Sequence, residues 1–570
     1  MSYDRQKMWD RLGEEKLDLL IIGGGINGAG IARDAALRGL SVAVVEARDL
    51  AYGTSSRSSK LIHGGLRYLE QLEFSLVFEA VSERRILMDI APHLVEPMGF
   101  IFPVYKDSRQ SLTMINTGLW LYEGLSLFRS PKRHRKLKLD DIRRHEPALK
   151  TEGLKGAPLY YDGATDDARL TLESAIDAAD NGAVVSTWTK AVSFLKDETS
   201  GRINGAVVKD MLGDEGLKEV HASAVINATG PWTDRTRKLS TEKVTEVLRP
   251  TKGVHVVVDH HRLPVNNAIV CFHPDDDRVL FAIPWGEQTY LGTTDTDFQG
   301  DPGQVMADGD DVSYLLDAAK EYFPDYPLSE EDVISTWAGL RPLIAPAGVD
   351  GDDISESDVS REHQILIGED GLITIAGGKL TTYRRMSAEV VDTAVKFLRL
   401  DNALPETLEE ARTDTRPLPG ARGWPDDDEV ARKQYEVQCV EAGQGHIDEE
   451  SAEFLVRTYG VRAPDLAALV ADDPRLGEPI VEGRPELMAQ VDWAVTKELA
   501  ATVTDVLVQR TQIYYRAPQQ GLEASHRVAQ RMAELLGWDE ARVSEEVERY
   551  ERDVEHSRRW QRDDDESDEQ

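Results

Sequence analysis

The chain contains very little cysteine. Of its 570 residues only Cys271 and Cys439 are cysteines, and no two lie at the C-x-x-C spacing. This scarcity excludes an iron–sulfur cluster or a zinc site that is held by several cysteines. It is typical of a protein from a reducing cytoplasm, and a disulfide between these two residues is the open alternative.

The chain also lacks a long apolar run. The nearest candidate for a membrane span, residues 118–128, contains Glu123 and falls short of the roughly 18 apolar residues that a span needs. We expect it to be a buried or partner-facing helix. The first 16 residues are polar and have no apolar core of a signal peptide. We therefore expect a cytoplasmic protein, with peripheral association with the cytoplasmic membrane face left open.

Positive charge is scarce as well. The sequence has 102 Asp and Glu against 66 Lys and Arg, a formal net charge of −36, and only 21 of those 66 are Lys. Such a surface repels nucleic acid, so we expect no nucleic-acid partner. Acid spread along the whole chain with little Lys favours adaptation to molar salt, where the Debye length is about 3 Å. An acidic protein from a low-salt host is the alternative.

What the chain does contain is a glycine motif between a strand and a helix. The apolar residues 17–22 run into Gly23, Gly25 and Gly28, which have the G-x-G-x-x-G spacing. A second apolar strand, residues 41–45, ends at Glu46. Glycines let backbone approach a pyrophosphate at a helix N-terminus, and an acidic residue at this distance binds a ribose. The pattern predicts a dinucleotide site.

Two further strands end in glycine. Residues 224–230 read AVINATG and residues 372–378 read LITIAGG, so that Gly230 and Gly378 close apolar runs far along the chain. A simple nicotinamide-binding unit needs only the first glycine motif. Three glycine-ended strands favour FAD, bound along most of its length.

Pattern changes divide the chain. Short β-branched runs between residues 249 and 294 predict antiparallel strands. A Pro- and Gly-rich break at 416–425 precedes a helical region, and the chain ends in an acidic run. We predict an α/β (α+β) fold: a two-dinucleotide-binding FAD domain (17–90, 155–248 and 340–400), an inserted antiparallel substrate or cap domain (91–154 and 249–339), a C-terminal helical domain (426–555) and an acidic disordered tail (556–570).

The segment 53–70, GTSSRSSKLIHGGLRYLE, carries the densest chemistry. Its Ser and Thr hydroxyls and glycine backbone suit a phosphate and a flavin edge. Arg67 suits a substrate anion, His63 suits proton transfer, and Tyr68 offers a hydroxyl. The segment predicts that substrate and cofactor meet here.

Taken together, these motifs resemble the respiratory, quinone-linked group of FAD-dependent glycerol-3-phosphate dehydrogenases, in a halophilic archaeal form. The matching runs stand in family order over residues 17–400: IIGGGINGAGIARDAALRGLSVAVVE, TSSRSSKLIHGGLRYLE, INATGPW, FAIPW with GTTD, GLRPL and AGGKLTTYR. The run TDVLVQRT, Thr504 to Thr511, resembles part of the family's C-terminal domain.

The resemblance implies oxidation of sn-glycerol 3-phosphate to dihydroxyacetone phosphate by hydride transfer to FAD. It implies catalytic roles for His63, Arg67, His255, Arg341 and Lys379, with His63 and His255 as alternative proton acceptors. Substrate binding falls to Arg67, Tyr68, Arg341, Lys379 and Thr382. The implied cofactor residues are Gly23, Gly25, Asn27, Gly28, Glu46, Ser55, Ser59, Gly230, Gly378 and Lys379, and no metal is expected.

Several functions stay open at this point. Electrons pass to the quinone pool or to a partner subunit; a glycerol-3-phosphate oxidase that uses oxygen is the nearest alternative. An amine or amino-acid oxidase of the same fold, or a non-catalytic flavin subunit, is more distant. The anaerobic bacterial form has a cysteine-rich C-terminal module, which this chain lacks. The helical region 426–555 is a candidate for a homodimer interface or a partner dock.

Overall fold

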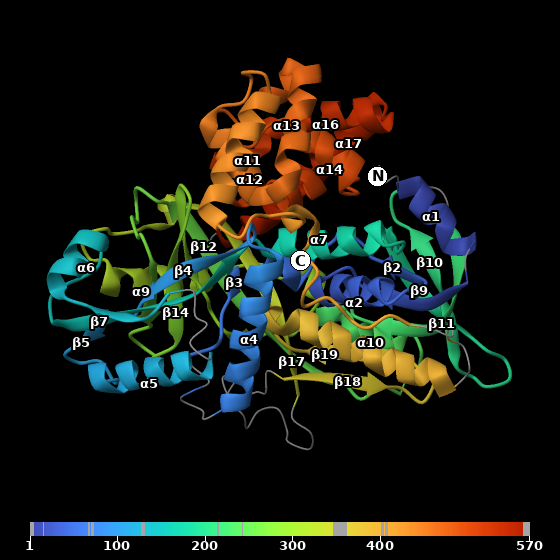
Figure 1. Ribbon diagram of the computed structural model, residues 1–570, viewed down its shortest axis with the longest axis horizontal. Coiled ribbons are helices and arrows are strands. Elements are labelled where there is room, and N and C mark those ends of the chain that lie inside the picture. The colour runs from blue at the N-terminus through green and yellow to red at the C-terminus, as the bar shows by residue number, and fades with distance from the viewer. Residues whose placement is uncertain are drawn as a thin grey trace, which may run out of the picture.

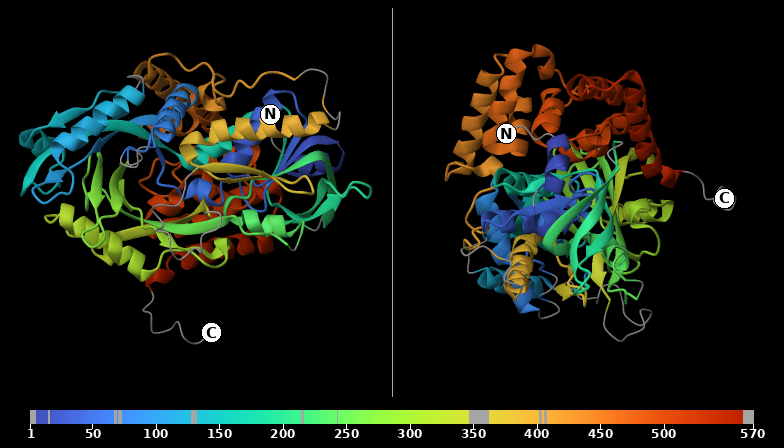
Figure 2. Two further views of the ribbon diagram at one scale, coloured as in Figure 1. Left: turned by 90° about the horizontal axis from the view of Figure 1, so that it is seen from below. Right: turned by 90° about the vertical axis from the view of Figure 1, so that its right-hand side faces the viewer.

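The computed structural model describes residues 5–14, 16–66, 69, 73–126, 132–213, 216–241, 243–345, 362–400, 404 and 408–561. Its described strands form one sheet of eight strands and one of eleven. The C-terminal helices stand together on one side of these sheets (Figures 1 and 2). The predicted class, an α/β fold with a C-terminal helical region, is confirmed.

The eight-stranded sheet has the order β18–β19–β11–β1–β2–β8. The strands from β19 to β8 are parallel, β18 pairs antiparallel with β19, and β10 and β9 continue from β11 as an antiparallel ribbon. Its strands are β1 (Leu17–Ile22), β2 (Val42–Val45), β8 (Val184–Ser186), β9 (Thr189–Lys196), β10 (Ile203–Asp210), β11 (Leu217–Asn227), β18 (His363–Ile367) and β19 (Ile373–Gly377).

Strand β1 is apolar on both faces because both faces are covered. Leu19 and Ile21 pack with residues of α2 (Ile26–Leu37) and α10 (Tyr383–Leu400). Leu20 and Ile22 face the other side, toward α1 (Arg5–Glu14) and α7 (Asp167–Asp180). A central parallel strand therefore shows a continuous apolar run instead of an alternation.

The eleven-stranded sheet is mostly antiparallel and has β12 near one end, paired with β15, β16 and β17. This confirms antiparallel pairing over residues 249–294. The strands are β3 (Leu61–Ile62), β4 (Val95–Ile101), β5 (Val104–Tyr105), β6 (Arg135–Leu137), β7 (Leu154–Thr165), β12 (Leu248–Asp259), β13 (Ala268–Phe272), β14 (Val279–Trp285), β15 (Gln288–Gly292), β16 (Thr296–Asp297) and β17 (Val333–Ile344).

Two strands belong to a different sheet from the one that the predicted domain boundaries imply. β3 and β7 fall in the segments 17–90 and 155–248, which we assigned to FAD binding, but both belong to the larger sheet. Residues 159–165 of β7 pair with β4, from the predicted cap segment 91–154. Strand pairing at this distance leaves no local signal, and the division into domains stays a prediction.

The remaining helices before the C-terminal region cover the outer faces and edges of the sheets (Figure 1). They are α4 (Phe74–Ile90), α5 (Leu112–Leu125), α6 (Leu139–His145), α8 (Thr233–Lys238) and α9 (Gly309–Tyr322).

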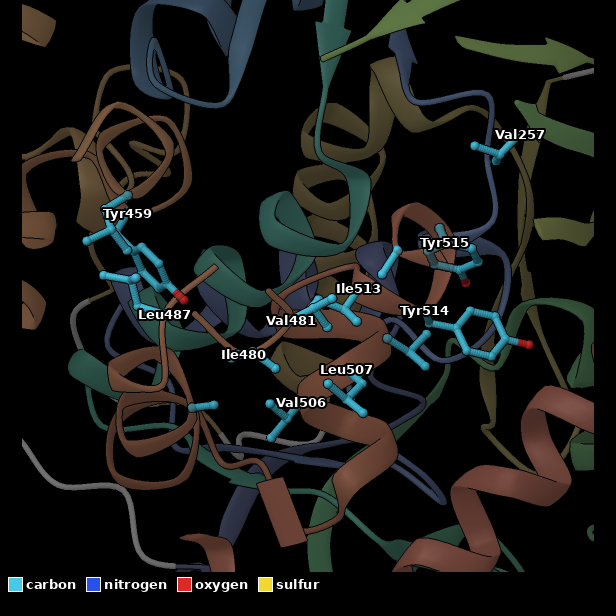
Figure 3. Close-up of a cluster of buried hydrophobic side chains, with 14 of the residues drawn as sticks. Val257, Tyr459, Ile480, Val481, Leu487, Val506, Leu507, Ile513, Tyr514 and Tyr515 are labelled. Carbon is cyan, nitrogen blue, oxygen red and sulfur yellow. The ribbon is translucent and has the colours of Figure 1, made fainter. Parts of the chain in front are cut away.

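The C-terminal helices pack on one face of the larger sheet. Val257 of β12 points toward them and joins their core, whereas Val256 and Val258 point to the opposite face, toward α9. Figure 3 shows Val257 near Tyr515, with Val506 and Leu507 in the same cluster. The helices are α11 (Asp428–Ala442), α12 (Glu449–Tyr459), α13 (Ala463–Asp472), α14 (Ala489–Lys497), α15 (Ile513–Arg516), α16 (Leu522–Leu536) and α17 (Glu540–Ser557).

The two cysteines are buried in different cores. Cys439 packs among the C-terminal helices, and Cys271 packs on the far face of the larger sheet. Both are free thiols, so the open alternative of a disulfide between them is not realised.

Leu507 makes the core of the C-terminal helices testable, because its side chain is fully buried. Leu507→Ala should lower the free energy of unfolding by about 3 kcal/mol, through lost burial and the cavity left behind. Chemical denaturation followed by circular dichroism measures the change. Leu536→Ala, at a leucine that is 42% exposed in α16, is the matched control and should change stability by less than about 1 kcal/mol. Equal losses would contradict this packing.

Candidate functional site

A large cavity, of about 810 Å³, lies where the two sheets meet. It is lined by the turns that follow β1, β11 and β19, by the segment after β2, and by β12 and β17. The three glycine-ended strands of the sequence therefore end at one cavity. Ligands of open parallel sheets bind in this position, beyond the carboxyl ends of the strands.

The first glycine turn forms a cradle of bare backbone, in which Gly23 and Gly28 leave no room for a side chain. Gly23 has a positive φ of 110°, and a Cβ there would lie 2.6 Å from the carbonyl oxygen of Ala228. Gly25 and Asn27 line the cavity at the start of α2. Gly28 does not line it; a Cβ at Gly28 would lie 1.8 Å from the Gly23 oxygen, so this glycine lets the helix lie against the strand.

Glu46 stands at the end of β2 and closes this end of the cavity. Its carboxylate accepts hydrogen bonds from the backbone N–H of Gly24 at 2.6 Å and of Arg48 at 2.9 Å. Burial raises the pKa of Glu46, while these two donors oppose the rise. The carboxylate is thus fixed beside the glycine turn, where it can accept hydrogen bonds from ribose hydroxyls.

The serine-rich segment lies along the cavity between Glu46 and the larger sheet. The backbone N–H of Ile26 donates to Ser55 Oγ at 2.9 Å, which ties this segment to the first turn of α2. Ser59 Oγ lies 2.9 Å from Nε2 of His255. Both serines line the cavity.

His255 lies on β12 and is 2% exposed. Its ring stacks on Trp337 of the neighbouring strand, with centroids 4.6 Å apart and planes at 15°. Gly292 leaves room for the ring, because a Cβ there would lie 2.1 Å from it. Burial, and after it the positive charges of Arg341 and Lys60, hold the pKa of His255 well below its usual range. A neutral imidazole on a cavity wall can accept a proton.

Arg341 lies on β17 and reaches the same cavity. Nη1 donates to Asp295 at 2.8 Å, and Nη2 donates to Thr293 Oγ1 and to the Thr294 carbonyl, each at 3.2 Å. A Cβ on Gly253 would lie 2.7 Å from Nη2, so that glycine makes room for the guanidinium. The cation is therefore held in one orientation.

The other predicted residues divide into three groups. His63, Gly230, Gly378 and Lys379 line the cavity. Thr382 does not: its hydroxyl donates to the Lys379 carbonyl at 3.4 Å, beside the sulfur of Met386, and the neighbouring Thr381 lines the cavity instead. Arg67 and Tyr68 lie outside the described residues.

A buried ion pair behind the serine segment was not predicted. Lys60 Nζ lies 2.7 Å from Asp167 Oδ1, and both residues are at most 3% exposed. Ser58 donates to Asp167 Oδ2 through its backbone N–H at 3.1 Å and its hydroxyl at 2.7 Å. The rings of Trp285, Trp337 and Tyr515 surround Nζ at 5.5–5.7 Å. The partners are 107 residues apart, so sequence spacing gives no sign of the pair.

Other cavity residues also escaped prediction. Arg48 lies 5.5 Å from the Tyr52 ring centre, and Arg57 approaches the same ring at 5.2 Å. Trp232 lines the cavity after β11, and Thr54 Oγ1 donates to the Leu340 carbonyl at 2.6 Å. In the sequence, only their position near the predicted site residues Glu46, Ser55 and Gly230 could have indicated them.

The residues present fit a dinucleotide of the FAD type. The glycine turn leaves backbone open to the cavity, a carboxylate acceptor lies where a ribose is expected, and the cavity continues past these to His255 and Arg341. Within the described ranges no cluster of three or more His, Cys, Asp or Glu could hold a metal ion. This geometry defines the site of a flavin-dependent oxidoreductase.

Comparison with known proteins agrees. Residues 18–384 match the family model of FAD dependent oxidoreductases, and residues 411–543 match that of the C-terminal domain of alpha-glycerophosphate oxidase. Glycerol-3-phosphate dehydrogenase 2 of Mycobacterium tuberculosis (strain ATCC 25618 / H37Rv) is 39% identical over 96% of this chain and 89% of its own. The aerobic glycerol-3-phosphate dehydrogenase of Staphylococcus haemolyticus is 37% identical over 95% of both chains.

A solved structure agrees with these relatives. The glycerol-3-phosphate dehydrogenase of Bacillus halodurans, in complex with FAD, superposes with a TM-score of 0.78 at 32% identity, covering 97% of each chain. The chain belongs to the glycerol-3-phosphate dehydrogenase family of FAD-dependent oxidoreductases.

Glu46 provides a test of the cofactor end of the cavity. Glu46→Gln keeps the size of the side chain but removes the charge that strengthens its hydrogen bonds, so FAD should bind about 10-fold more weakly. Fluorescence of flavin released from the protein measures the affinity. Glu219→Gln, at an exposed position of β11 outside the cavity, is the control and should bind FAD normally. If both variants keep the FAD affinity of the parent protein, the ribose does not bind at Glu46.

Proposed function

We propose that this chain oxidises sn-glycerol 3-phosphate to dihydroxyacetone phosphate. The substrate loses a hydride from C2 to FAD and a proton from the C2 hydroxyl to the protein. The observation that carries the proposal is the meeting of cationic and proton-accepting side chains, Arg341, Lys379 and His255, on one cavity that also contains the dinucleotide cradle. The names of relatives that are 37–39% identical support the same substrate.

Arg341 and Lys379 bind the phosphate of the substrate. A planar guanidinium held by Asp295 offers a fixed fork to phosphate oxygens, and Lys adds a compact positive charge. Lys379 follows the glycines at the end of β19, so it can also face the flavin. Arg67 and Tyr68 stay candidates from the sequence for the same phosphate.

His255 accepts the hydroxyl proton at Nε2, the ring nitrogen next to Ser59. Its low pKa keeps the imidazole neutral and ready to accept a proton at neutral pH. Stacking on Trp337 fixes the ring plane and excludes water from one face. His63 is the alternative acceptor. FAD, when bound, supplies the hydride acceptor; the protein supplies orientation, phosphate charge and proton transfer.

Anaerobic flavin absorbance tests the proposal. Glycerol 3-phosphate added to the FAD-loaded protein should bleach the long-wavelength flavin band, whereas amine and amino-acid substrates should not. His255→Gln should slow bleaching by about 100-fold or more, because general base catalysis contributes that much. His63→Gln should slow it less.

The outcomes separate the alternatives. A flavin that stays oxidised with glycerol 3-phosphate overturns the dehydrogenase proposal and favours an amine oxidase or a non-catalytic flavin subunit. If His63→Gln slows bleaching more than His255→Gln does, His63 is the general base. Fast reoxidation of the reduced flavin by oxygen, with peroxide release and no reaction with quinone, makes the protein an oxidase.

We further propose that the electrons pass to quinone in a respiratory chain, directly or through a partner subunit, and that the protein docks on the membrane through α4 and α5. Among the described helices none is long and apolar enough to cross a membrane. α4 and α5 pack together on the side of the molecule opposite the C-terminal helices (Figure 1). They expose the large apolar side chains of Phe74, Phe78, Met114, Trp120 and Leu121.

A basic segment lies beside this apolar surface. Residues 132–138, KRHRKLK, carry five Lys and Arg and no acid in a chain of net charge −36. The ring of His134 contacts that of Trp120, with centroids 4.7 Å apart, so the basic and apolar groups adjoin. Lys and Arg attract anionic headgroups, and Trp and Leu enter the interface.

Vesicles of phosphatidylglycerol test the docking surface. Trp120→Ser should reduce the protein that co-sediments with the vesicles by about 10-fold, as expected for one large apolar side chain. Leu217→Ser, at a 65% exposed leucine on β11, is the control and should sediment like the parent protein. Equal behaviour of both variants, or no sedimentation of the parent protein, would overturn docking through α5 and favour a partner subunit.

We propose a halophilic, archaeal origin on the ground of the acidic composition. A charge of −36 causes repulsion within the folded protein, which molar salt screens. Bleaching by substrate should therefore be faster in about 3 M KCl than in 0.1 M KCl, and the protein should keep this activity for longer in the higher salt. We also propose that the C-terminal helices form a homodimer interface. Measuring the oligomeric state of the protein in the same buffer tests this.

A further inference from the structure

The segment that joins β2 to β3, residues 46–60, contacts the cavity with one set of residues and the protein interior with another. We call it the cofactor loop. Most of its residues, among them Glu46, Ser55 and Ser59, line the cavity. The others turn away from it and are buried, each at most 3% exposed: Asp49, Leu50, Ala51, Ser56 and Lys60. The side that does not face the cofactor is therefore packed against protein.

Asp49 meets the C-terminal region on that buried side. Both oxygens of its carboxylate accept hydrogen bonds from the guanidinium of Arg510, in a bidentate pair; Nη2 to Oδ1 is 3.0 Å. Nη2 also donates to the Glu498 carbonyl at 2.6 Å. Arg510 is 1% exposed, and so is Asp49. One side chain from the C-terminal helices thus holds the cofactor loop directly.

Arg510 lies in the run TDVLVQRT, to which no function has yet been assigned. Residues Asp505–Arg510 form a wide helical turn, in which the N–H of Thr511 donates to the Val506 carbonyl at 3.0 Å. The same turn makes a second contact: Trp188 Nε1 donates to Asp505 at 3.0 Å. The backbone N–H of Trp188 in turn donates to the Arg48 carbonyl at 2.8 Å. Both ends of this turn are therefore linked to residues 48–49.

The position of Asp49 is coupled to the cofactor contacts through short links. The N–H of Ala51 donates to the Gly24 carbonyl at 3.1 Å, and the N–H of Gly24 donates to Glu46. Burial raises the pKa of Asp49 to about 7, against the effect of Arg510. Without Arg510 the buried carboxylate would lose its bidentate partner, and turning it toward water would shift the backbone on which Glu46 and the glycine turn depend.

We propose that Arg510 is a positioning residue for FAD, which acts through Asp49 to hold the cofactor loop in its binding conformation. The inference rests on the FAD-dependent family assignment and is independent of the substrate. It gives the C-terminal helices a role in cofactor retention. It would fail separately from the proposed dehydrogenase activity, because its readout is flavin binding.

The test compares FAD affinities of folded variants, by release of flavin fluorescence at a temperature well below each melting point. Asp49→Asn and Arg510→Gln should each raise the FAD dissociation constant about 10-fold or more, as loss of a partner behind a ligand site does. The double variant should be no weaker than either single one, because both act through one contact. Arg510→Lys, which keeps the charge and loses the fork, should be intermediate.

Arg484→Gln is the matched control. Arg484 makes a bidentate pair with Glu486, with both bonds at 3.0 Å, and it is also buried, but its other partners, Glu287 and the Arg516 carbonyl, lie outside the cofactor loop. This variant should melt lower and bind FAD within about 3-fold of the parent protein. Equal FAD loss in Arg484→Gln, additive losses in the double variant, or normal FAD affinity in Asp49→Asn would overturn the proposal. If Arg510→Gln does not fold, Asp49→Asn and Arg510→Lys decide.

Discussion

The ion pair of Lys60 with Asp167 joins the parts of this protein on which the site depends. Lys60 ends the cofactor loop, Asp167 begins α7 beneath the smaller sheet, and Ser58 binds the same carboxylate. Aromatic rings of the larger sheet and of the C-terminal helices enclose the ammonium. One of these rings, Trp337, stacks on His255. Because an uncompensated buried charge costs about 3–5 kcal/mol, each of these parts keeps the others in place.

Local patterns predicted the parts of the site that are local. The glycine cradle and Glu46 after β2 follow from spacing, since each depends on a few consecutive residues. Contacts across sheets could not be predicted in this way. Asp295, for example, orients Arg341 from 46 residues away.

Thr382, which the sequence offers as a substrate residue, does not line the cavity, whereas its neighbour Thr381 does. Both Thr381 and Thr382 follow Lys379, but a short helical turn at Leu380–Thr382 points the first into the cavity and the second toward Met386. Sequence identity at the motif could not choose between them, because the choice depends on the direction in which that turn leaves β19.

The excess of Arg over Lys has an internal use besides the surface one. Arg33, Arg84, Arg169 and Arg510 are among the largest fully buried side chains, and each contacts a buried carboxylate. A guanidinium binds a carboxylate with two parallel hydrogen bonds, which an ammonium cannot do. Pairs of this kind are shielded from salt. From composition alone, all of these Arg side chains would be expected on the solvent-exposed surface.

The two-sided cofactor loop also limits how this chain can change. Connecting segments on protein surfaces ordinarily vary in length, because their outer side meets only water. Along residues 46–60, runs of cavity-facing residues are separated by buried protein-facing residues. One inserted or deleted residue would bring a cavity-facing residue, such as Arg48 or Tyr52, to the buried position next to it. Variation in this family should therefore occur here by replacement at fixed length.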